Sequence, residues 1–505
     1  MQITQPKAAC RKNLFLEIAT CAFLFSMFFQ VFSNNIADLD LWHQMALFRE
    51  FIALEHIPLE DHFAYTPTIY PSVQHEWGAG AIAYFLGTRF GGRGILAAKY
   101  LLASIIVVFF LLCIKKRGVS KEVLIFLAPI GIGLVSRSFA TTRAQMYSFA
   151  FVACLLWFFE LERNGNRRWL AFWIALYLIW INLHGGFLVG IGLLGAFWSE
   201  RLLRREAQLH LILAGVTVLG LIAVNPYGLS YYSYLWRAMT MARPYIAEWY
   251  PIWRSSELLQ LSMFLMSLIL VIYSVMKIGI NKADGLAVLF AAALAAFFCV
   301  RLFFFYALVW TIYVPGYLQR TQLGNLMEGL CKKLSKFLIP ILCIAAVAIF
   351  VRALSYQPWK LIVPSDHIKK YGNHPIYPIG PVQYLKEAAF KGNLMVFFDW
   401  GSYVTWKLYP DVRVSMDSRY EVAYPEWLVD ENIRFYRGED GWESILTKYP
   451  TDLLLVEKRF PLAKVMPQSK WKKVYTDKVF ELYARPGLIL PIVDWTGLVF
   501  VGSFP

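Results

Sequence analysis

Long apolar segments separated by short polar ones fill the first 352 residues of the chain. A hydrocarbon layer about 30 Å thick is crossed by a helix of roughly 20 apolar residues. The pattern therefore predicts about eleven transmembrane helices. They are expected at residues 14–33, 94–114, 121–136, 144–161, 168–183, 185–199, 208–224, 258–276, 284–300, 302–318 and 337–352. The first is too long for a secretory signal and lacks a small-residue cleavage site, so we expect it to remain as a membrane helix.

Beyond residue 352 the pattern changes to short apolar runs that alternate with segments whose apolar residues recur at helical spacing. Strands are expected at residues 394–398, 412–416 and 453–456, and a hairpin is expected at 474–483 around Asp477 and Lys478. Short strands mixed with helices are typical of a small α/β domain. The predicted fold class is thus an α-helical polytopic membrane protein with a transmembrane domain at 1–352 and a C-terminal α/β domain at 353–505.

Two longer polar stretches interrupt the apolar pattern. The first, an expected loop at residues 34–92, contains half of the eight histidines and many carboxylates. Four apolar residues in it recur at helical spacing, namely Leu41, Met45, Phe48 and Ile52. With Pro58 ending the run, this spacing predicts an amphipathic helix on the membrane surface. The second stretch, residues 225–257, is rich in Tyr, Trp and Arg, which suit a membrane interface.

Composition and charge support a membrane protein and give it an orientation. The chain is 58% hydrophobic and only 16% charged, unlike ordinary soluble proteins. Its net charge of +15 does not indicate a nucleic-acid partner, because the basic residues lie between apolar segments instead of on one surface. If the N-terminus is cytoplasmic, every second loop is basic, as the positive-inside rule requires. An odd number of helices then places residues 353–505 outside the cytoplasm.

The sequence Asp38-Leu39-Asp40-Leu41-Trp42-His43 directly follows the first predicted helix. In an extended chain, residues two apart project to the same side, so the carboxylates of Asp38 and Asp40 can converge on one substrate or one hard cation. The alternative is that these acids cap the surface helix, which is a common use of Asp. His43 is close enough in sequence to join either arrangement.

Three further candidates lie in the same loop and one lies between two later helices. Asp61, His75 and Glu76 combine carboxylates and imidazoles near an apolar boundary, where shifted pKa values can produce general bases. Any solvated loop can also contain such residues. His184 precedes two glycines at a tight helix connection, so it either contacts a substrate or only satisfies the turn.

Arginines at the predicted outer ends of helices are candidates for binding phosphate. A guanidinium binds phosphate through two parallel hydrogen bonds, although interfacial arginines also reach toward lipid headgroups without further role. Arg137, Arg143 and Arg301 are the candidates. Arg143 and Arg301 open or interrupt apolar runs, and an ionisable group at that depth needs a partner.

Taken together, these motifs resemble those of the GT-C superfamily of glycosyltransferases, and more narrowly a set of bacterial membrane proteins. The motifs are Asp38-Leu39-Asp40-Leu41-Trp42-His43, His75-Glu76-Trp77, Arg143-Ala144-Gln145, Leu183-His184-Gly185-Gly186-Phe187 and Asp399-Trp400-Gly401-Ser402-Tyr403. The resemblance covers most of the chain. It implies a GT-C-like membrane domain in a bacterial inner membrane, with an extracytoplasmic C-terminal domain that is periplasmic or extracellular.

The resemblance also implies an activity. A hexosyl or pentosyl unit would pass, with inversion, from a polyprenyl-phosphate-linked donor to a lipid, glycan or protein acceptor. Asp38 or Asp40 would act as the catalytic base, and a divalent cation such as Mg²⁺ or Mn²⁺ would bind these two acids if one is used. The expected phosphate-binding residues are Arg143, Arg301 and Arg137. The expected substrate-binding residues are His43, His75, Glu76, Asp61 and His184.

Three other functions are compatible with the sequence. A polysaccharide polymerase or ligase would place essential arginines in a large central loop, and residues 225–257 form a loop of only moderate size. A transporter or flippase would favour inverted repeats and helices broken by Gly or Pro, and neither is evident. A non-catalytic envelope assembly protein would use the two aspartates structurally.

Overall fold

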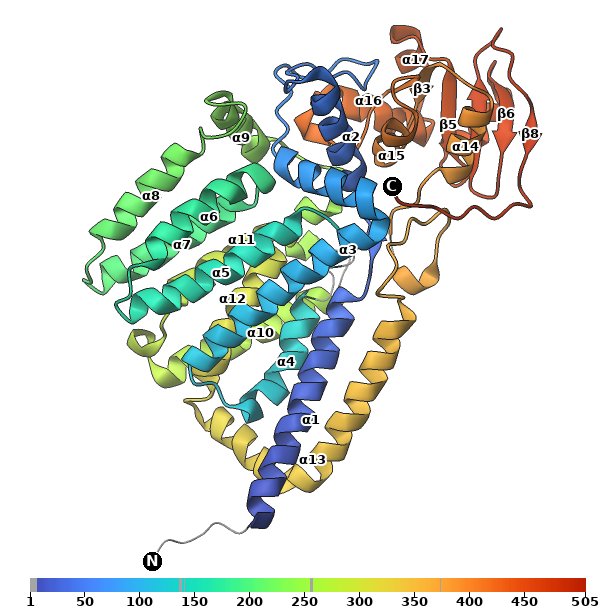
Figure 1. Ribbon diagram of the computed structural model, residues 1–505. Helices are drawn as coiled ribbons and strands as arrows, with labels where there is room; N and C mark the ends of the chain where they lie inside the picture. Colours follow the sequence, from blue (N-terminus) through green and yellow to red (C-terminus); the bar gives the residue numbers. More distant parts are fainter. Residues whose placement is uncertain (1–6, 136–138, 140, 255–257, 373) are drawn as a thin grey trace, which may run out of the picture.

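The computed structural model describes residues 7–135, 139, 141–254, 258–372 and 374–505. The described chain forms a tall bundle of helices with a mixed β-sheet region at one end (Figure 1). The N-terminal helix begins at the end of the bundle farthest from the sheet. The last residues lie between the bundle and the sheet region (Figure 1). We call these two ends of the bundle the far end and the sheet end.

Each predicted apolar window lies on a helix. The helices are α1 (Lys7–Phe32), α3 (Trp77–Lys116), α4 (Lys121–Val135), α5 (Gln145–Arg163), α6 (Trp169–Leu183), α7 (Phe187–Leu203), α8 (Leu209–Leu221), α10 (Leu258–Ile278), α11 (Leu286–Phe298), α12 (Phe303–Leu318) and α13 (Gln322–Ser355). In the described chain, five segments are long and apolar enough to cross a membrane, and three further apolar helices are shorter. A total of eleven crossings stays a prediction.

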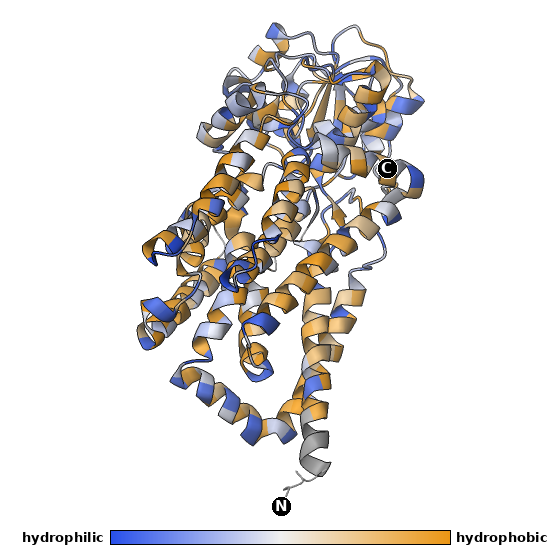
Figure 2. Ribbon diagram, turned by 60° about the vertical axis from the view of Figure 1, so that its left-hand side comes forward, coloured by the Kyte–Doolittle hydropathy of each residue, from blue (hydrophilic) through white to orange (hydrophobic). Residues whose placement is uncertain are grey.

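Burial separates the central helix from the peripheral ones. In the most apolar window of the segment Val300–Leu318, which contains α12, 78% of the residues are buried, against 17% in α10 and in α13. Hydrophobic residues predominate along the bundle helices, and hydrophilic ones are more frequent at the ends of the bundle and in the sheet region (Figure 2). Helices that expose apolar side chains in this way are suited to contact lipid, whereas α12 forms the core of the bundle.

Two helices differ from their predicted boundaries. The helix α3 begins at Trp77, within the loop expected to extend to residue 92, and it bends at Gly91, whose φ of 59° suits a glycine. The helix α13 begins at Gln322, so Lys332 and Lys336 lie within a helix instead of a cytoplasmic loop. The added part of α13 mixes polar with apolar residues, and the added part of α3 is rich in glycine and interrupted by Thr88 and Arg89, so a search for long continuous apolar runs misses both.

The segment between α1 and α3, which we call the first connection, contains a helix at the predicted residues. Residues 41–47 are buried on all sides and Ile52 of the predicted apolar face is exposed, so the expected amphipathic burial is not observed, and a position on the membrane surface stays a prediction. This helix, α2 (Leu39–Leu54), ends with Glu55 in the left-handed region at φ 60°. The later polar stretch contains α9 (Ser230–Thr240) and the short 3-10 turns η1 (Ala247–Trp249) and η2 (Ile252–Arg254). Other short turns are η3 (Ile280–Lys282), η4 (Val300–Leu302), η5 (Lys369–Tyr371), η6 (Tyr420–Val422) and η7 (Met466–Gln468).

A six-stranded sheet forms the C-terminal region, with the strand order β4-β3-β5-β7-β6-β8. Its strands are β3 (Gly392–Met395), β4 (Val412–Val414), β5 (Leu453–Glu457), β6 (Lys472–Thr476), β7 (Phe480–Ala484) and β8 (Val493–Asp494). The strand β3 is parallel to β4 and β5, whereas β7 is antiparallel to β5 and β6. The predicted hairpin is present, and Asp477 Oδ1 accepts hydrogen bonds from the backbone N–H groups of Val479 (2.6 Å) and Phe480 (2.7 Å).

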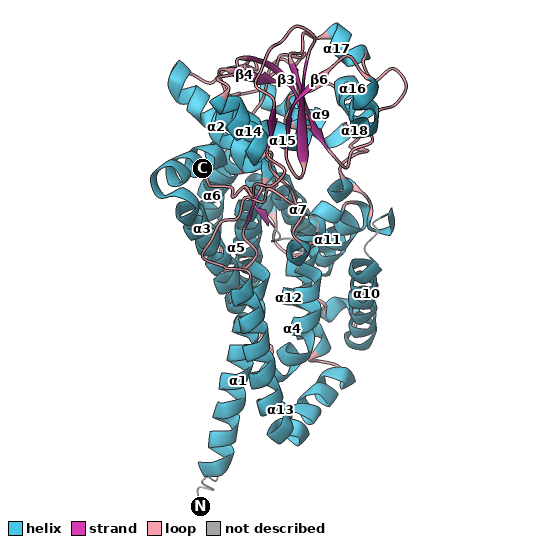
Figure 3. Cartoon of the chain, turned by 90° about the vertical axis from the view of Figure 1, so that its right-hand side faces the viewer, coloured by secondary structure: helices cyan, strands magenta, loops and turns pink. Residues whose placement is uncertain are grey.

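Helices pack on both sides of this sheet. They are α14 (Ile379–Glu387), α15 (Phe398–Leu408), α16 (Glu426–Arg437), α17 (Ser444–Lys448) and α18 (Leu462–Val465). Figure 3 shows α14 and α15 on the side of α2, with α16 and α18 across the sheet. The strand predicted at 394–398 is shorter than expected, because Phe398 already begins α15.

The first connection and the C-terminal region share one hydrophobic core. Trp42 packs against Tyr377 and Tyr403 with ring centroids 5.6 and 5.0 Å apart. Ala64 forms a parallel bridge with Val414 in the edge strand β4, and this pairing covers an edge that would otherwise be exposed. The two parts therefore stabilise each other through buried contacts between distant segments.

The packing of α15 predicts a sharp difference between two glycines. A Cβ atom on Gly401 would lie 1.9 Å from the carbonyl oxygen of Met416, whereas one on Gly192 in α7 would meet nothing within 4 Å. We expect Gly401→Ala to destabilise the protein by about 1–3 kcal/mol, because the α15 backbone must shift. Gly192→Ala should preserve or slightly raise stability, since Ala favours a helix. Thermal unfolding in detergent measures both, and equal Tm values would contradict this close packing.

Candidate active site

The backbone before Asp38 is fixed by segments from distant parts of the sequence. The chain leaves α1 and forms the strand β1 (Ile36–Ala37), which pairs in parallel with β2 (Thr141–Thr142). On its other side, the N–H of Ala37 donates to the carbonyl of Ile362 at 2.9 Å. The buried Lys99 Nζ donates to Asn35 Oδ1 at 2.8 Å. These contacts determine where the two aspartates lie.

Asp38 caps α2 and its carboxylate is largely occupied. Oδ1 accepts from the N–H of Asp40 at 3.2 Å, and Oδ2 accepts from the hydroxyl of Thr141 at 2.5 Å. The Nε atom of Arg143 lies 4.0 Å from the same Oδ2. The capping role that the sequence left open is therefore present, and it places Asp38 beside an arginine.

Asp40 lies in the first turn of α2 and has a less occupied carboxylate. Its side chain is 30% exposed, and Nδ1 of His43 lies 3.8 Å from its Oδ1. Among the described residues, no donor hydrogen-bonds to this carboxylate. Burial, together with the carboxylates of Asp38 and Glu76, raises the pKa of Asp40 well above its ordinary value. A carboxylate with free lone pairs and a raised pKa is suited to accept a proton.

Glu76, His75 and His184 come together beside Asp40. The Oε1 atom of Glu76 lies 3.4 Å from His75 Nε2 and 3.3 Å from His184 Nε2. The side-chain amide of Gln44 donates to Oε2 of the same carboxylate. Three of the predicted substrate-binding residues thus form one cluster, although they come from two separate parts of the sequence.

The contacts of His184 define its tautomer. Its Nδ1 accepts a hydrogen bond from the N–H of Gly186 at 2.8 Å and lies 2.7 Å from the hydroxyl of Ser148. Ser148 also accepts from the indole of Trp180 at 2.7 Å, and the N–H of Gly186 is the donor that requires an unprotonated Nδ1. The imidazole proton therefore resides on Nε2, where it points to Glu76. The Gly185–Gly186 turn and the acidic cluster are linked by this one ring.

Two of the predicted phosphate-binding arginines lie close enough to Asp40 to interact with its charge. The Nη1 and Nη2 atoms of Arg143 donate to the two carboxylate oxygens of Glu248 in η1, at 3.0 and 2.8 Å. The guanidinium of Arg301 in η4 lies 5.3 Å from the ring centre of Trp249. It makes no ion pair or hydrogen bond with the rest of the described chain. Arg137 falls outside the described residues.

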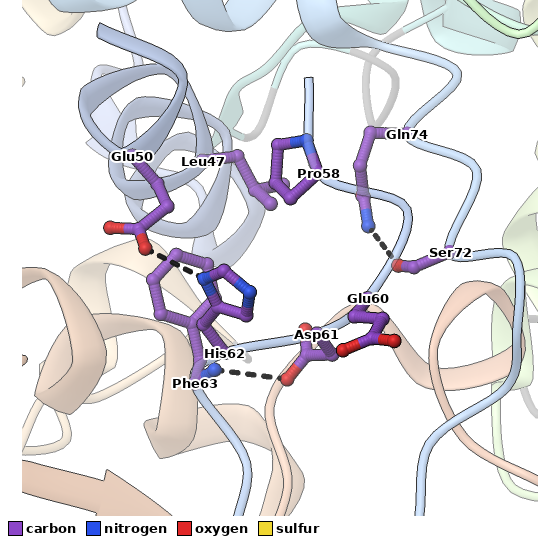
Figure 4. A pocket seen from close by; sticks show the side chains of 9 residues that line it. All are labelled: Leu47, Glu50, Pro58, Glu60, Asp61, His62, Phe63, Ser72 and Gln74. Atoms are coloured by element: carbon purple, nitrogen blue, oxygen red, sulfur yellow. Dashed lines mark hydrogen bonds and ion pairs between the residues drawn. The ribbon is translucent and has the colours of Figure 1, made fainter. Parts of the chain in front are cut away.

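His43 and Asp61 face the sheet region instead of the Glu76 cluster. His43 Nδ1 lies 3.0 Å from the hydroxyl of Ser418, and burial lowers the pKa of His43 to about 4. Asp61 forms a fully buried ion pair with Arg419. Figure 4 shows Asp61 directed to the backbone of Phe63, at the edge of a small pocket. These positions join the first connection to the C-terminal region.

An apolar groove runs from the bundle to Arg143. It lies between α2, both parts of α3 and the start of α5. Leu41, Ala83, Ile95 and Leu102 supply apolar walls, while Lys99, Thr142 and Arg143 supply polar groups. The buried hydroxyl of Thr142 has no hydrogen-bond partner among the described residues. The sequence did not reveal this groove, since its walls come from separate segments.

Asp399 adds a carboxylate from the C-terminal region. It lies in the first turn of α15, which packs against α2. Burial raises the pKa of Asp399 to about 7, with a contribution from the carboxylates of Asp38 and Glu457. No group of three or more His, Cys, Asp or Glu side chains in the described ranges is arranged to hold a metal ion. Cation binding by Asp38 and Asp40 stays a prediction.

Comparisons with known proteins identify the fold. No protein-family model and no curated protein matches the sequence. The structure is similar to that of ArnT from Cupriavidus metallidurans in the apo state, with a TM-score of 0.51, 13% identity, and coverage of 95% of this chain and 98% of ArnT. The same ArnT bound to undecaprenyl phosphate gives a TM-score of 0.50, 13% identity, and coverage of 94% and 97%.

The arabinofuranosyltransferase AftD from Mycobacteria is similar as well, with a TM-score of 0.50 and 13% identity. The match covers 94% of this chain and 40% of AftD, so this chain corresponds to only a part of that longer protein. Matches over almost the whole chain agree with the apolar helices described above. The chain is therefore a multi-pass membrane protein with the fold of the GT-C superfamily of glycosyltransferases.

Proposed function

We propose that the protein transfers a sugar from a polyprenyl-phosphate-linked donor to an acceptor at the sheet end of the bundle. The observation that carries this proposal is the free carboxylate of Asp40 beside two arginines, in a GT-C fold. An acid that can accept a proton and cations that can stabilise a leaving phosphate are the two requirements of this transfer. ArnT, which has a similar fold, binds undecaprenyl phosphate, and this supports the proposal.

In the proposed reaction, Asp40 accepts the proton of an acceptor hydroxyl as the hydroxyl oxygen attacks the anomeric carbon. The bond between that carbon and the phosphate oxygen of the carrier breaks, and its electron pair remains on the phosphate. Arg143 and Arg301 stabilise the resulting negative charge. Attack opposite to the leaving group inverts the anomeric configuration. Asp38 positions the start of α2 through its contacts with Thr141 and Arg143.

The groove provides a place for the lipid part of the donor. Its walls are mainly apolar, and Arg143 lies among its polar lining residues. A polyprenyl chain in this groove would therefore have its phosphate near Arg143.

The remaining features of the proposal concern location and substrate class. The protein resides in a bacterial inner membrane with its N-terminus in the cytoplasm and its sheet region in the periplasm or outside the cell. The transferred unit is a hexosyl or pentosyl group, and the acceptor is a lipid, glycan or protein. If the reaction uses Mg²⁺ or Mn²⁺, Asp38 and Asp40 supply the carboxylates.

A transfer assay with defined donors tests the proposal. Purified protein in detergent is incubated with radiolabelled polyprenyl-phosphate hexoses and pentoses and with a membrane extract as the acceptor source. We expect label to appear in an acceptor fraction, and NMR of the product to show an inverted anomeric centre. Absence of transfer from every donor, by protein with a cooperative thermal transition, would contradict the proposed function.

The variant Arg301→Ala tests the contribution of Arg301 to phosphate binding. Its guanidinium has no ion-pair partner in the described chain, so Arg301→Ala breaks no ion pair. We expect the variant to lower kcat/KM for the donor by about 10- to 100-fold, because a charged donor to the leaving phosphate is lost. Arg254→Ala is a matched control, since Arg254 also stacks on an aromatic ring, that of Tyr250 at 4.8 Å. Equal losses in both variants would argue against a specific role for Arg301.

A further inference from the structure

Arg143 lies near the carboxylates of Asp38 and Glu248, and Glu248 accepts hydrogen bonds from both terminal nitrogens of the guanidinium. Glu248 accepts from both Nη atoms at 3.0 and 2.8 Å, whereas Asp38 lies 4.0 Å from Nε. A phosphate presents a similar pair of oxygens to a guanidinium. We propose that Glu248 occupies the place of the donor phosphate in the resting protein and is displaced when the lipid-linked donor binds. This inference rests on the proposed function.

The surroundings of the two carboxylates indicate which one can leave. The side chain of Asp38 is 12% exposed and is held by Thr141 and by the backbone of α2. Glu248 is 42% exposed and lies in the three-residue turn η1, between α9 and α10. Within the described chain, the carboxylate of Glu248 forms hydrogen bonds and an ion pair only with Arg143. Rotation of one side chain is therefore enough to release the guanidinium.

The segment around Glu248 can stay in place during this rotation. Trp249 contacts two arginines, with the guanidinium carbons of Arg243 and Arg301 at 3.9 and 5.3 Å from its ring centre. The carbonyl of Tyr250 accepts from the N–H of Val300 at 3.0 Å. These contacts hold η1 against η4, so the displaced carboxylate moves while its backbone remains. The freed fork of Arg143 then lies near the unpaired guanidinium of Arg301.

Charge repulsion makes Glu248 and a bound phosphate compete for Arg143. Burial would raise the pKa of Glu248, but the charges of Arg143 and Arg301 lower it to about 2, so the carboxylate is ionised at neutral pH. A phosphate that entered while Glu248 remained would place a third anion on one guanidinium. A ligand must therefore gain at least as much free energy from Arg143 as is lost when the ion pair between Glu248 and Arg143 breaks. A lipid-linked phosphate gains additional energy from the apolar groove, whereas free phosphate does not.

The inference predicts a gain of affinity on removal of a charge. We expect Glu248→Gln to bind undecaprenyl phosphate about tenfold more tightly than the wild type, measured by titration of the purified protein in detergent. Inorganic phosphate should show detectable competition only in this variant. Glu206→Gln is the matched control, because Glu206 is 40% exposed and pairs with Arg201 at 2.9 Å, and its affinity should not change. The gain should vanish in Glu248→Gln combined with Arg143→Ala.

Other outcomes distinguish this inference from the proposed function. If Arg143→Ala weakens binding and Glu248→Gln also weakens it or leaves it unchanged, Glu248 orients Arg143 instead of competing, and only this inference is overturned. If no variant binds undecaprenyl phosphate and the wild type transfers no sugar, both are overturned. Should Glu248→Gln unfold at a lower temperature, Glu248→Asp provides a second test. Its shorter carboxylate cannot reach both Nη atoms from the same backbone, so binding should again tighten.

Discussion

Asp40→Asn should lower the rate of sugar transfer by about 10²–10⁴-fold, the range expected for loss of a general base. Asparagine has nearly the same shape and cannot accept the proton. Donor binding should persist, since the arginines and the groove are unchanged. In the wild type, kcat/KM should fall as the pH is lowered, because protonation of Asp40 removes the base. The fall should begin at a pH above the ordinary pKa of Asp, since the pKa of Asp40 is raised. This acid limb should be absent from the residual activity of the variant.

Asp38→Asn provides the comparison for that result. Asparagine also caps helices through its Oδ1, and its Nδ2 can donate to the hydroxyl of Thr141 in place of the bond that Asp38 accepts, so the start of α2 should be preserved. We expect a smaller loss than in Asp40→Asn at equal thermal stability. A full loss in Asp38→Asn with normal activity in Asp40→Asn would exchange the roles of the two acids. Full activity in both variants would contradict the mechanism.

Arg419→Met should be the most destabilising single change at the junction with the sheet region. The guanidinium is 1% exposed and pairs with Asp61 and with Asp417, which are themselves buried. Its removal leaves two carboxylates buried without their partner, which costs about 3–5 kcal/mol. Thermal unfolding in detergent and the yield of monodisperse protein measure the effect.

The matched control for Arg419→Met is Arg413→Met. Arg413 lies in β4 and is exposed, so its replacement should change stability by no more than about 0.5 kcal/mol. Asp61→Asn adds a milder test if Arg419→Met does not fold. A wild-type Tm in Arg419→Met would show that the buried ion pairs do not hold the junction.

The elements that depend on local pattern could be predicted from the sequence. Continuous apolar runs indicated the positions of the bundle helices, and the spacing from Leu41 to Ile52 indicated α2. The turn at Asp477 was predictable because its side chain satisfies nearby backbone groups. The amphipathic first half of α13 escaped the same reasoning, since its polar residues interrupt the apolar run.

The candidate site was only partly predictable, because it depends on contacts between distant residues. The sequence named both aspartates, but their different surroundings depend on Thr141 and Arg143, more than 100 positions later. It placed Asp61 with the substrate-binding residues, whereas Arg419, the partner of Asp61, is 358 positions away. Glu248 was not singled out. One signal was available, since Glu248 is the only acid among residues 225–254.

The core shared by the first connection and the sheet region has a consequence for biogenesis. Trp42 and Phe63 are synthesised early, yet the tyrosines and the edge strand that bury them emerge from the ribosome only after the last bundle helix. Contacts of such long sequence separation form late. The aspartate-bearing segment must therefore wait, exposed at the membrane surface, while the intervening helices insert. The proposed site is complete only when the C-terminal region has been translated and has docked.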